Sequence, residues 1–179
     1  TVDIMLGILH AETLLADHQF QAAIDVLETL ETEDQQLNFR ITQSLTHYAD
    51  ALDRWDQEVL IRETEATKDD NPRCVIDTSR GPVTVELFED DAPNTVANFI
   101  KLAEEGFYEG TKFHRVLPGF MAQGGDPNSK EGSEIPPGIG DAGYKIRDEH
   151  IGSAYRRHYT GALAMANTGG PNSGGSQFY

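Results

Sequence analysis

Residues 113–126 of this chain read Phe113-His114-Arg115-Val116-Leu117-Pro118-Gly119-Phe120-Met121-Ala122-Gln123-Gly124-Gly125-Asp126. It follows a turn at residues 107–110 that leads into a strand. It precedes residues 127–144, which are rich in Gly, Pro, Ser and Asp and predict a long loop. Taken alone, Arg115 predicts a surface ion pair, and Phe120 and Met121 predict core packing. Long loops on compact domains are often functional, though many only vary in sequence.

The residues before this stretch predict a β-hairpin followed by a helix. Side chains in residues 74–88 alternate with a period of two, and Arg80-Gly81-Pro82 predicts the turn between two strands. Asp91 is expected to cap a helix that begins at Ala92-Pro93, because proline is tolerated in the first helical turn. Gly106 is expected to end that helix in a left-handed conformation.

Residues 1–66 predict a different structure, namely antiparallel helices. Apolar residues recur there every three or four positions, which is the period of amphipathic helices. Polar breaks at residues 17–19 and 31–34 separate three helical segments. Because residues 1–10 already read as the inside of a helix, we expect further sequence before them. Residues 67–73 predict a polar linker, since Asn71-Pro72 disfavours helix.

The helical segment has a weak internal repeat. Phe20 and Trp55 are 35 positions apart, and each follows a polar break. This spacing is close to the ~34-residue period of tetratricopeptide repeats, and residues 14–24 resemble the turn between the two helices of such a repeat. A plain helical appendage is the alternative. Because one and a half repeats bury no core alone, the helices are expected to pack on further sequence, on the next domain or on a protein partner.

Composition excludes several classes of function. The net charge is −16, and residues 1–73 carry 16 acidic against 5 basic side chains. Such a field repels phosphate backbones, so we expect no nucleic-acid partner. No segment approaches the ~18 apolar residues of a membrane helix, and the chain is predicted to be soluble. Cys74 is the single cysteine, which excludes an intrachain disulfide, and no Cys/His spacing indicates a metal site.

Three blocks in order carry a resemblance to a known family, the cyclophilin-type peptidyl-prolyl cis/trans isomerases. The quoted stretch resembles the main motif of that family, and Ala92–Phe99 resembles its first helix. Met165-Ala166-Asn167, together with residues 170–173 and 176–178, matches its second motif. The resemblance covers residues 74–179. With the helices it predicts an α+β chain, in which an antiparallel β-barrel, incomplete at the C-terminus, follows residues 1–66.

The resemblance implies an enzyme that accelerates rotation about X–Pro peptide bonds of polypeptide substrates and so assists protein folding. No cofactor and no metal is implied. It makes Arg115 the catalytic arginine. It implies that the substrate is contacted by His114, Phe120, Met121, Gln123, Ala166, Asn167, Gln177 and Tyr179.

Two departures from the family concern the C-terminal end of the chain. Tyr179 stands where the family has Phe at the pocket floor, and its hydroxyl requires water or a partner. The family continues beyond this position for roughly another third of the domain, with a Trp-Leu pair and a His that complete the pocket. An unclosed barrel leaves an unpaired strand edge and an apolar interior open to water, so we expect this chain to fold poorly or to aggregate.

Two other functions stay open at this point. One is a non-catalytic binder of proline-containing peptides, although such a binder would be expected to lack Arg115. The other is a helical interaction scaffold with secondary isomerase activity. The loop at residues 127–144 suggests a bacterial source, and hence a cytoplasmic or periplasmic location.

Overall fold

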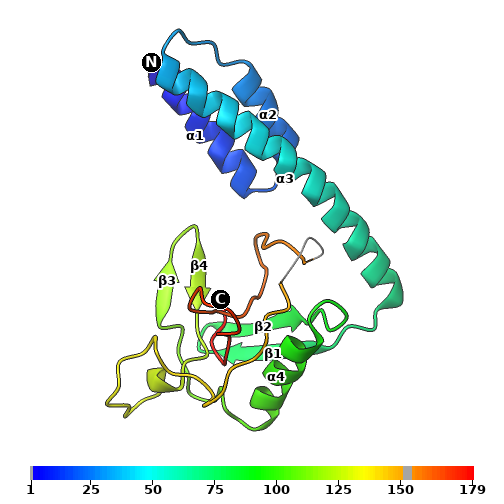
Figure 1. The fold of residues 1–179 in the computed structure, drawn as a ribbon, viewed down its shortest axis with the longest axis vertical. Helices are drawn as coiled ribbons and strands as arrows, with labels where there is room; N and C mark the ends of the chain where they lie inside the picture. Colours follow the sequence, from blue (N-terminus) through cyan, green and yellow to red (C-terminus); the bar gives the residue numbers. More distant parts are fainter. Residues whose placement is uncertain (1, 151–154) are drawn as a thin grey trace. The chain divides into compact units, whose positions relative to one another are not determined.

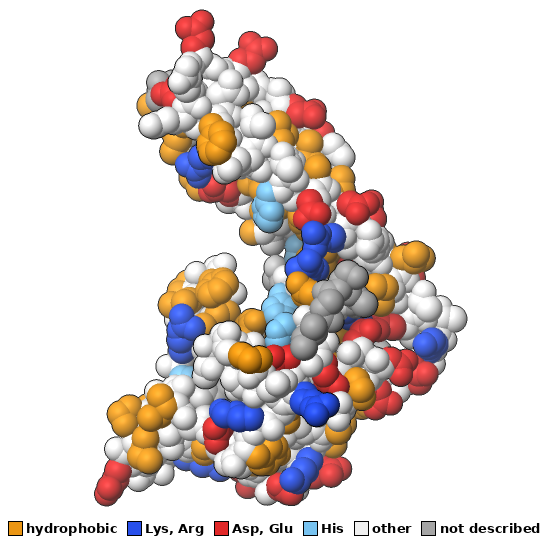
Figure 2. Space-filling model, viewed as in Figure 1, with side chains coloured by type: hydrophobic (Ala, Val, Ile, Leu, Met, Phe, Trp, Pro, Cys, Tyr) orange, Lys and Arg blue, Asp and Glu red, His pale blue; other side chains and the backbone are white. Residues whose placement is uncertain are grey.

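The computed structural model describes residues 2–150 and 155–179. The chain divides into two units, Thr1–Asp69 and Asp70–Tyr179 (Figure 1). Acidic side chains are spread over the face of both units shown in Figure 2, as the net charge of −16 leads one to expect. Within the described residues, no helix combines the length and the apolar character needed to cross a bilayer.

The first unit consists of three helices, α1 (Val2–Ala16), α2 (Phe20–Glu28) and α3 (Gln35–Lys68). The two polar breaks predicted from the sequence fall between them. Asp34 caps α3, since its carboxylate accepts hydrogen bonds from the backbone N–H groups of Gln36 and Leu37 at 2.9 and 3.1 Å. The helix runs two residues further than predicted, and Asp69 ends it with φ of 48°.

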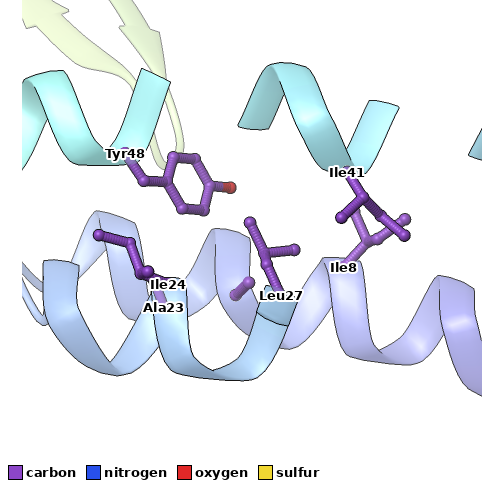
Figure 3. Packing of buried hydrophobic residues seen from close by; sticks show 7 residues of the cluster. Ile8, Ala23, Ile24, Leu27, Ile41 and Tyr48 are labelled. Carbon is purple, nitrogen blue, oxygen red and sulfur yellow. The ribbon is translucent and has the colours of Figure 1, made fainter. Parts of the chain in front are cut away.

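A single apolar cluster joins the three helices. In Figure 3, Ile8 of α1 points toward Ile41 of α3, and Tyr48 of α3 lies over Ala23 and Ile24 of α2. The rings of Phe20 and Trp55, which define the 35-residue spacing, lie 5.8 Å apart. However, α3 continues unbroken through residues 52–54, where a second copy of the repeat would turn.

In the part of the second unit that the structure describes, there are two small antiparallel sheets and one α-helix. Strands β1 (Arg73–Thr78) and β2 (Gly81–Glu86) form the predicted hairpin, with Cys74 opposite Val85. Strands β3 (Arg115–Leu117) and β4 (Met121–Gln123) form the second sheet, and a short 3₁₀ helix, η1 (Pro127–Ser129), follows. Within the described residues these sheets do not close into a barrel.

Helix α4 (Pro93–Glu104) is capped by a residue distant in sequence. The prediction that Asp91 caps it is wrong: the cap position is Ala92, which offers no side-chain acceptor. Instead, the Glu149 carboxylate accepts hydrogen bonds from the backbone N–H groups of Asn94 and Thr95, at 3.0 and 2.8 Å, and from both of their side chains at 2.7 Å. At the other end, Gly106 has φ of 68°, as predicted.

The same hydrogen bonds set the pKa of Glu149. Burial acts to raise this pKa, but the bonds from Thr95 and Asn94 favour the charged form and bring it below its ordinary value. A carboxyl with a lowered pKa in the folded state stabilises that state above its unfolded pKa, and this stabilisation is lost as the pH falls.

We expect Glu149→Gln to lower the free energy of unfolding by about 1–2 kcal/mol at neutral pH, as loss of a helix cap does. The difference from the parent should shrink as the pH falls through and below about 4.3, the ordinary glutamate value. Urea unfolding at several pH values measures it, with the exposed Glu131→Gln as control. A difference that is constant with pH would contradict the assignment.

A second prediction concerns the helical unit. Leu27 is 0% exposed at the centre of the apolar cluster, so Leu27→Ala should lower the free energy of unfolding by about 2–5 kcal/mol. Leu9 of α1 is 56% exposed, and Leu9→Ala should change it by less than about 0.5 kcal/mol. Urea unfolding followed by helical circular dichroism compares the two, and equal effects would argue against this core.

Candidate active site

The β3–β4 hairpin gathers several of the predicted site residues on one face. In its register Arg115 lies opposite Gln123, and Leu117 lies opposite Met121. Because side chains alternate along a strand, these four residues share a face of the hairpin, while Val116 and Ala122 occupy the other. The turn between the strands is closed by a hydrogen bond from the Phe120 N–H to the Leu117 carbonyl at 3.0 Å.

Arg115 begins a line of three hydrogen-bonded side chains. Its guanidinium is exposed, and Nη1 donates to Oε1 of Gln123 in a long contact of 3.4 Å. Gln123 Nε2 in turn donates to Oε1 of Gln177 at 2.8 Å. The structure therefore joins the two motifs through these three side chains, of which Gln123 and Gln177 are 54 residues apart in the sequence.

Residues 177–179 bring the second motif to the hairpin. Phe178 exchanges backbone hydrogen bonds with Gly124 at 2.9 and 3.2 Å. On the other side, Tyr179 exchanges two with Ala164 at 2.9 Å, and the Ala166 N–H donates to the Gln177 carbonyl at 2.8 Å. Because the segment is extended, Gln177 and Tyr179 point away from the face on which Phe178 lies.

Phe178 anchors this segment in the core of the second unit. It is buried, and its ring makes edge-to-face contacts with Phe99 and Tyr108, both at 5.6 Å, and with Phe113 at 6.2 Å. Gly125 permits the close approach, since a Cβ there would lie 2.5 Å from the Ser176 carbonyl oxygen and its φ is +78°.

Behind Gln177 lies a buried acid, Asp126, at the end of the first motif. Its Oδ1 accepts from the Asn128 N–H at 2.7 Å, which caps η1. Its Oδ2 accepts from the N–H groups of Gly138 and Gly140, at 2.5 and 3.0 Å, and from Gln177 Nε2 at 3.1 Å. Asp126 is not among the site residues predicted from the sequence. An acid directly before Pro127, a residue that favours the first position of a helix, was the signal for the cap.

Tyr179 has a partner for its hydroxyl. The oxygen lies 3.1 Å from His158 Nδ1, and the two rings are 5.6 Å apart. Burial raises the pKa of Tyr179. Burial also lowers the pKa of His158, and the charges of His150 and Arg157 act in the same direction. The hydroxyl that distinguishes this position from the family's Phe is thus satisfied within the chain.

The remaining predicted residues lie less close together. Phe120 is 77% exposed at the tip of the hairpin, whereas Met121 is half-buried. Both ring nitrogens of His114 are buried, and they have no hydrogen-bond partner among the described residues. Asn167 is exposed, and its Oδ1 accepts from the Gly169 N–H at 2.9 Å.

Two other features of this unit lie outside that arrangement. A surface hollow of about 580 Å³ lies beside α4, and none of the predicted site residues, all of which the structure describes, lines it. Over residues 2–150 and 155–179, no group of three or more His, Cys, Asp or Glu side chains is placed to hold a metal ion.

Comparison with known proteins defines the class of this unit. The family described as "Cyclophilin type peptidyl-prolyl cis-trans isomerase/CLD" matches residues 73–179. The chain belongs to this family, as the three sequence blocks predicted.

Particular relatives are similar over the same region. A peptidyl-prolyl cis-trans isomerase of Synechococcus elongatus is 46% identical over 107 residues, which are 60% of this chain and 66% of that protein. Peptidyl-prolyl cis-trans isomerase B of Bacillus subtilis is 48% identical over 97 residues, or 54% of this chain and 62% of that one. The chain therefore spans slightly less than two thirds of the length of these relatives.

A solved structure is also similar. It is a cyclophilin-type peptidyl-prolyl cis-trans isomerase of Cryptosporidium parvum, crystallised in the presence of the dipeptide Ala-Pro. Its sequence is 31% identical, the TM-score is 0.47, and the match covers 60% of this chain and 65% of that one.

The close approach at Gly125 gives a prediction. Gly125→Ala should lower the free energy of unfolding by more than the ~1–3 kcal/mol of a non-glycine residue at positive φ, because the new Cβ also displaces Ser176. Gly132 has a similar φ of +82° with open space around it, so Gly132→Ala isolates the conformational cost. Thermal unfolding compares the two variants. Equal losses of stability would show that the contact with Ser176 does not contribute.

Proposed function

We propose that this chain is a peptidyl-prolyl cis/trans isomerase, and that Arg115 is its catalytic residue. The observation that carries the proposal is the placement of the Arg115 guanidinium. It is exposed on one face of the β3–β4 hairpin and contacts Gln123, in a chain that belongs to the cyclophilin-type family. The substrates are polypeptides that contain proline.

Rotation about an X–Pro bond is accelerated by a hydrogen-bond donor near the proline nitrogen, and the Arg115 guanidinium can supply one. The barrier to rotation about a peptide bond is about 18–20 kcal/mol, because rotation breaks amide conjugation. Twisting localises a lone pair on the proline nitrogen, and an N–H of Arg115 can donate to it. This hydrogen bond is stronger in the twisted transition state than in either planar isomer, which is the requirement for catalysis. Rotation breaks no covalent bond, so the mechanism needs neither a nucleophile nor a cofactor.

Other residues would bind and orient the substrate. Gln123 holds the guanidinium from the opposite strand and would also donate to a substrate carbonyl. Phe120 and Met121 supply apolar surface for the proline ring, and the exposure of Phe120 leaves it free to close on a substrate. Ala166 and Asn167 would pair with the substrate backbone, a mode of recognition that tolerates many side chains.

The same proposal covers the remaining site residues and the architecture. His114 would shape the pocket, and Gln177 and Tyr179 would line the groove. Residues 74–179 would form part of an antiparallel barrel, which is supported by the bridges from Phe178 to both Gly124 and Met165. Residues 67–73 would link it to the helices of residues 1–66, in which α1 and α2 represent one tetratricopeptide-like pair. A bacterial cytoplasmic or periplasmic location stays a prediction.

Two alternative functions stay open. A non-catalytic binder of proline peptides would use the same hairpin face without accelerating rotation. A helical scaffold for a protein partner is favoured by the exposed apolar side chains of α1, which include Val2, Leu6 and Leu9.

The test is cis/trans exchange of an Ala-Pro-Phe peptide, measured by magnetisation-transfer NMR without a coupled protease. We expect the 179-residue chain to accelerate exchange. Arg115→Ala should reduce kcat/KM by about a hundredfold or more, the effect of removing a donor to a developing charge. Arg80→Ala, which removes an exposed arginine at the β1–β2 turn of the same unit, should leave the rate unchanged.

Each other outcome has a clear meaning. If a folded chain binds the peptide but does not accelerate exchange, the peptide-binder alternative replaces the enzyme. If Arg115→Ala exchanges the peptide as fast as the parent, Arg115 is not the catalytic residue. Amide spectra of each protein establish folding in both cases.

A further inference from the structure

Asp126 is a fully buried acid of the second unit, and the proposed mechanism does not use it. Its side chain is 0% exposed, and four hydrogen bonds end on its two carboxylate oxygens. The chain is built closely around it, because a Cβ on Gly140 would lie only 2.2 Å from Oδ1. A buried carboxylate surrounded by donors is strongly fixed in position.

Asp126 also fixes the direction of the hydrogen bonds that reach Arg115. A carboxylate only accepts, so Gln177 must turn its Nε2 toward it. The same Nε2 donates to the carbonyls of Gly138 and Gly140 at 3.2 and 2.8 Å, in a loop that Asp126 itself holds by their N–H groups. Every group on this side of Gln177 is therefore an acceptor.

The orientation of the Gln177 amide in turn determines the orientation of the Gln123 amide. With Nε2 of Gln177 facing the Asp126 carboxylate and the two carbonyls of the loop that this carboxylate holds, its Oε1 faces Gln123 and accepts from Nε2 there. Gln123 is left with Oε1 toward the guanidinium of Arg115, which has donors only. With the opposite orientation of Gln123, an NH₂ group would meet the guanidinium donors. The attraction would be replaced by repulsion, and Arg115 would lose its support.

We propose that Asp126 is a positioning residue for Arg115, acting through Gln177 and Gln123. The buried acid, together with the Gly138 and Gly140 carbonyls of the loop that it holds, sets the orientation of both amides, so that an acceptor faces the guanidinium. Its effect on catalysis rests on the proposed isomerase function, whereas its effect on the two amides does not.

A purely structural role for Asp126 is the competing explanation, because it also caps η1 through Asn128. Ser129 offers a matched control for that role. It is buried in the same short helix, where its hydroxyl donates to the Asp126 backbone carbonyl at 2.6 Å and accepts from the Lys112 N–H at 2.8 Å. Ser129→Ala loosens this loop without touching the carboxylate.

The decisive variant is Asp126→Asn, which keeps the shape of the side chain but turns one acceptor into a donor. Magnetisation-transfer NMR on the Ala-Pro-Phe peptide, over a range of peptide concentrations, separates kcat from KM for the 179-residue chain. We expect kcat to fall between about tenfold and a hundredfold, as for a misplaced catalytic group, with KM changed by less than about twofold. The side-chain amide signals of Gln123 and Gln177 should shift. Ser129→Ala should change neither.

Several outcomes would overturn the proposal. One is a folded Asp126→Asn chain with unchanged kcat and unchanged glutamine side-chain signals. Another is an equal loss of kcat in Ser129→Ala. If Asp126→Asn does not fold, the proposal is tested on the unmodified chain by nuclear Overhauser effects from the Gln123 Nε2 protons. The proposal requires that these protons lie near Gln177. If they lie near the Arg115 guanidinium instead, the proposal is wrong. If the unmodified chain does not accelerate exchange, the proposed function is wrong. The glutamine side-chain signals then still test whether Asp126 orients Gln177 and Gln123.

Discussion

The second unit depends on the docking of residues 177–179 between Gly124 and residues 164–166. This pairing buries Phe178 against Phe99, Tyr108 and Phe113, and it satisfies the backbone of the segment on both sides. The alternation of an extended chain then turns Gln177 to the opposite face, where it meets Gln123. One packing event therefore builds the core and assembles the line of side chains that ends at Arg115.

The rest of the site follows from a polar network rather than from a deep cavity. Arg115 lies on an exposed strand, and its orientation comes from a series of hydrogen bonds that begins at a fully buried acid. Buried polar groups of this kind are costly unless every member has a partner, and each member here has one. This arrangement suits a reaction that requires a donor held in place, since the transition state differs from the ground state mainly in the twist of one bond.

Long-range contacts of the same type organise the helix of this unit. The local sequence offers Asp91 as a cap for α4, yet the structure uses Glu149, more than 50 residues away. Four hydrogen bonds from two adjacent residues outweigh one local acceptor, and they tie the later loop to the start of the helix. In the first unit the cap of α3 is local, because Asp34 directly precedes the helix that it caps.

The family and the order of helices and strands could be predicted from the sequence alone. These depend on local patterns: the period of two in residues 74–88, the apolar stripes of the helices, and the motif at residues 113–126. Of the predicted site residues, the structure joins Arg115, Gln123 and Gln177 by hydrogen bonds. The sequence also indicated a repeat from Phe20 and Trp55, whereas the structure has one unbroken helix through the second copy. Only the tertiary structure decided the roles of Glu149 and Asp126 and gave the Tyr179 hydroxyl its partner in His158. The reason is physical, because a cap or an amide orientation depends on which donors and acceptors meet in space, and a local pattern carries no information about groups that lie far away along the chain.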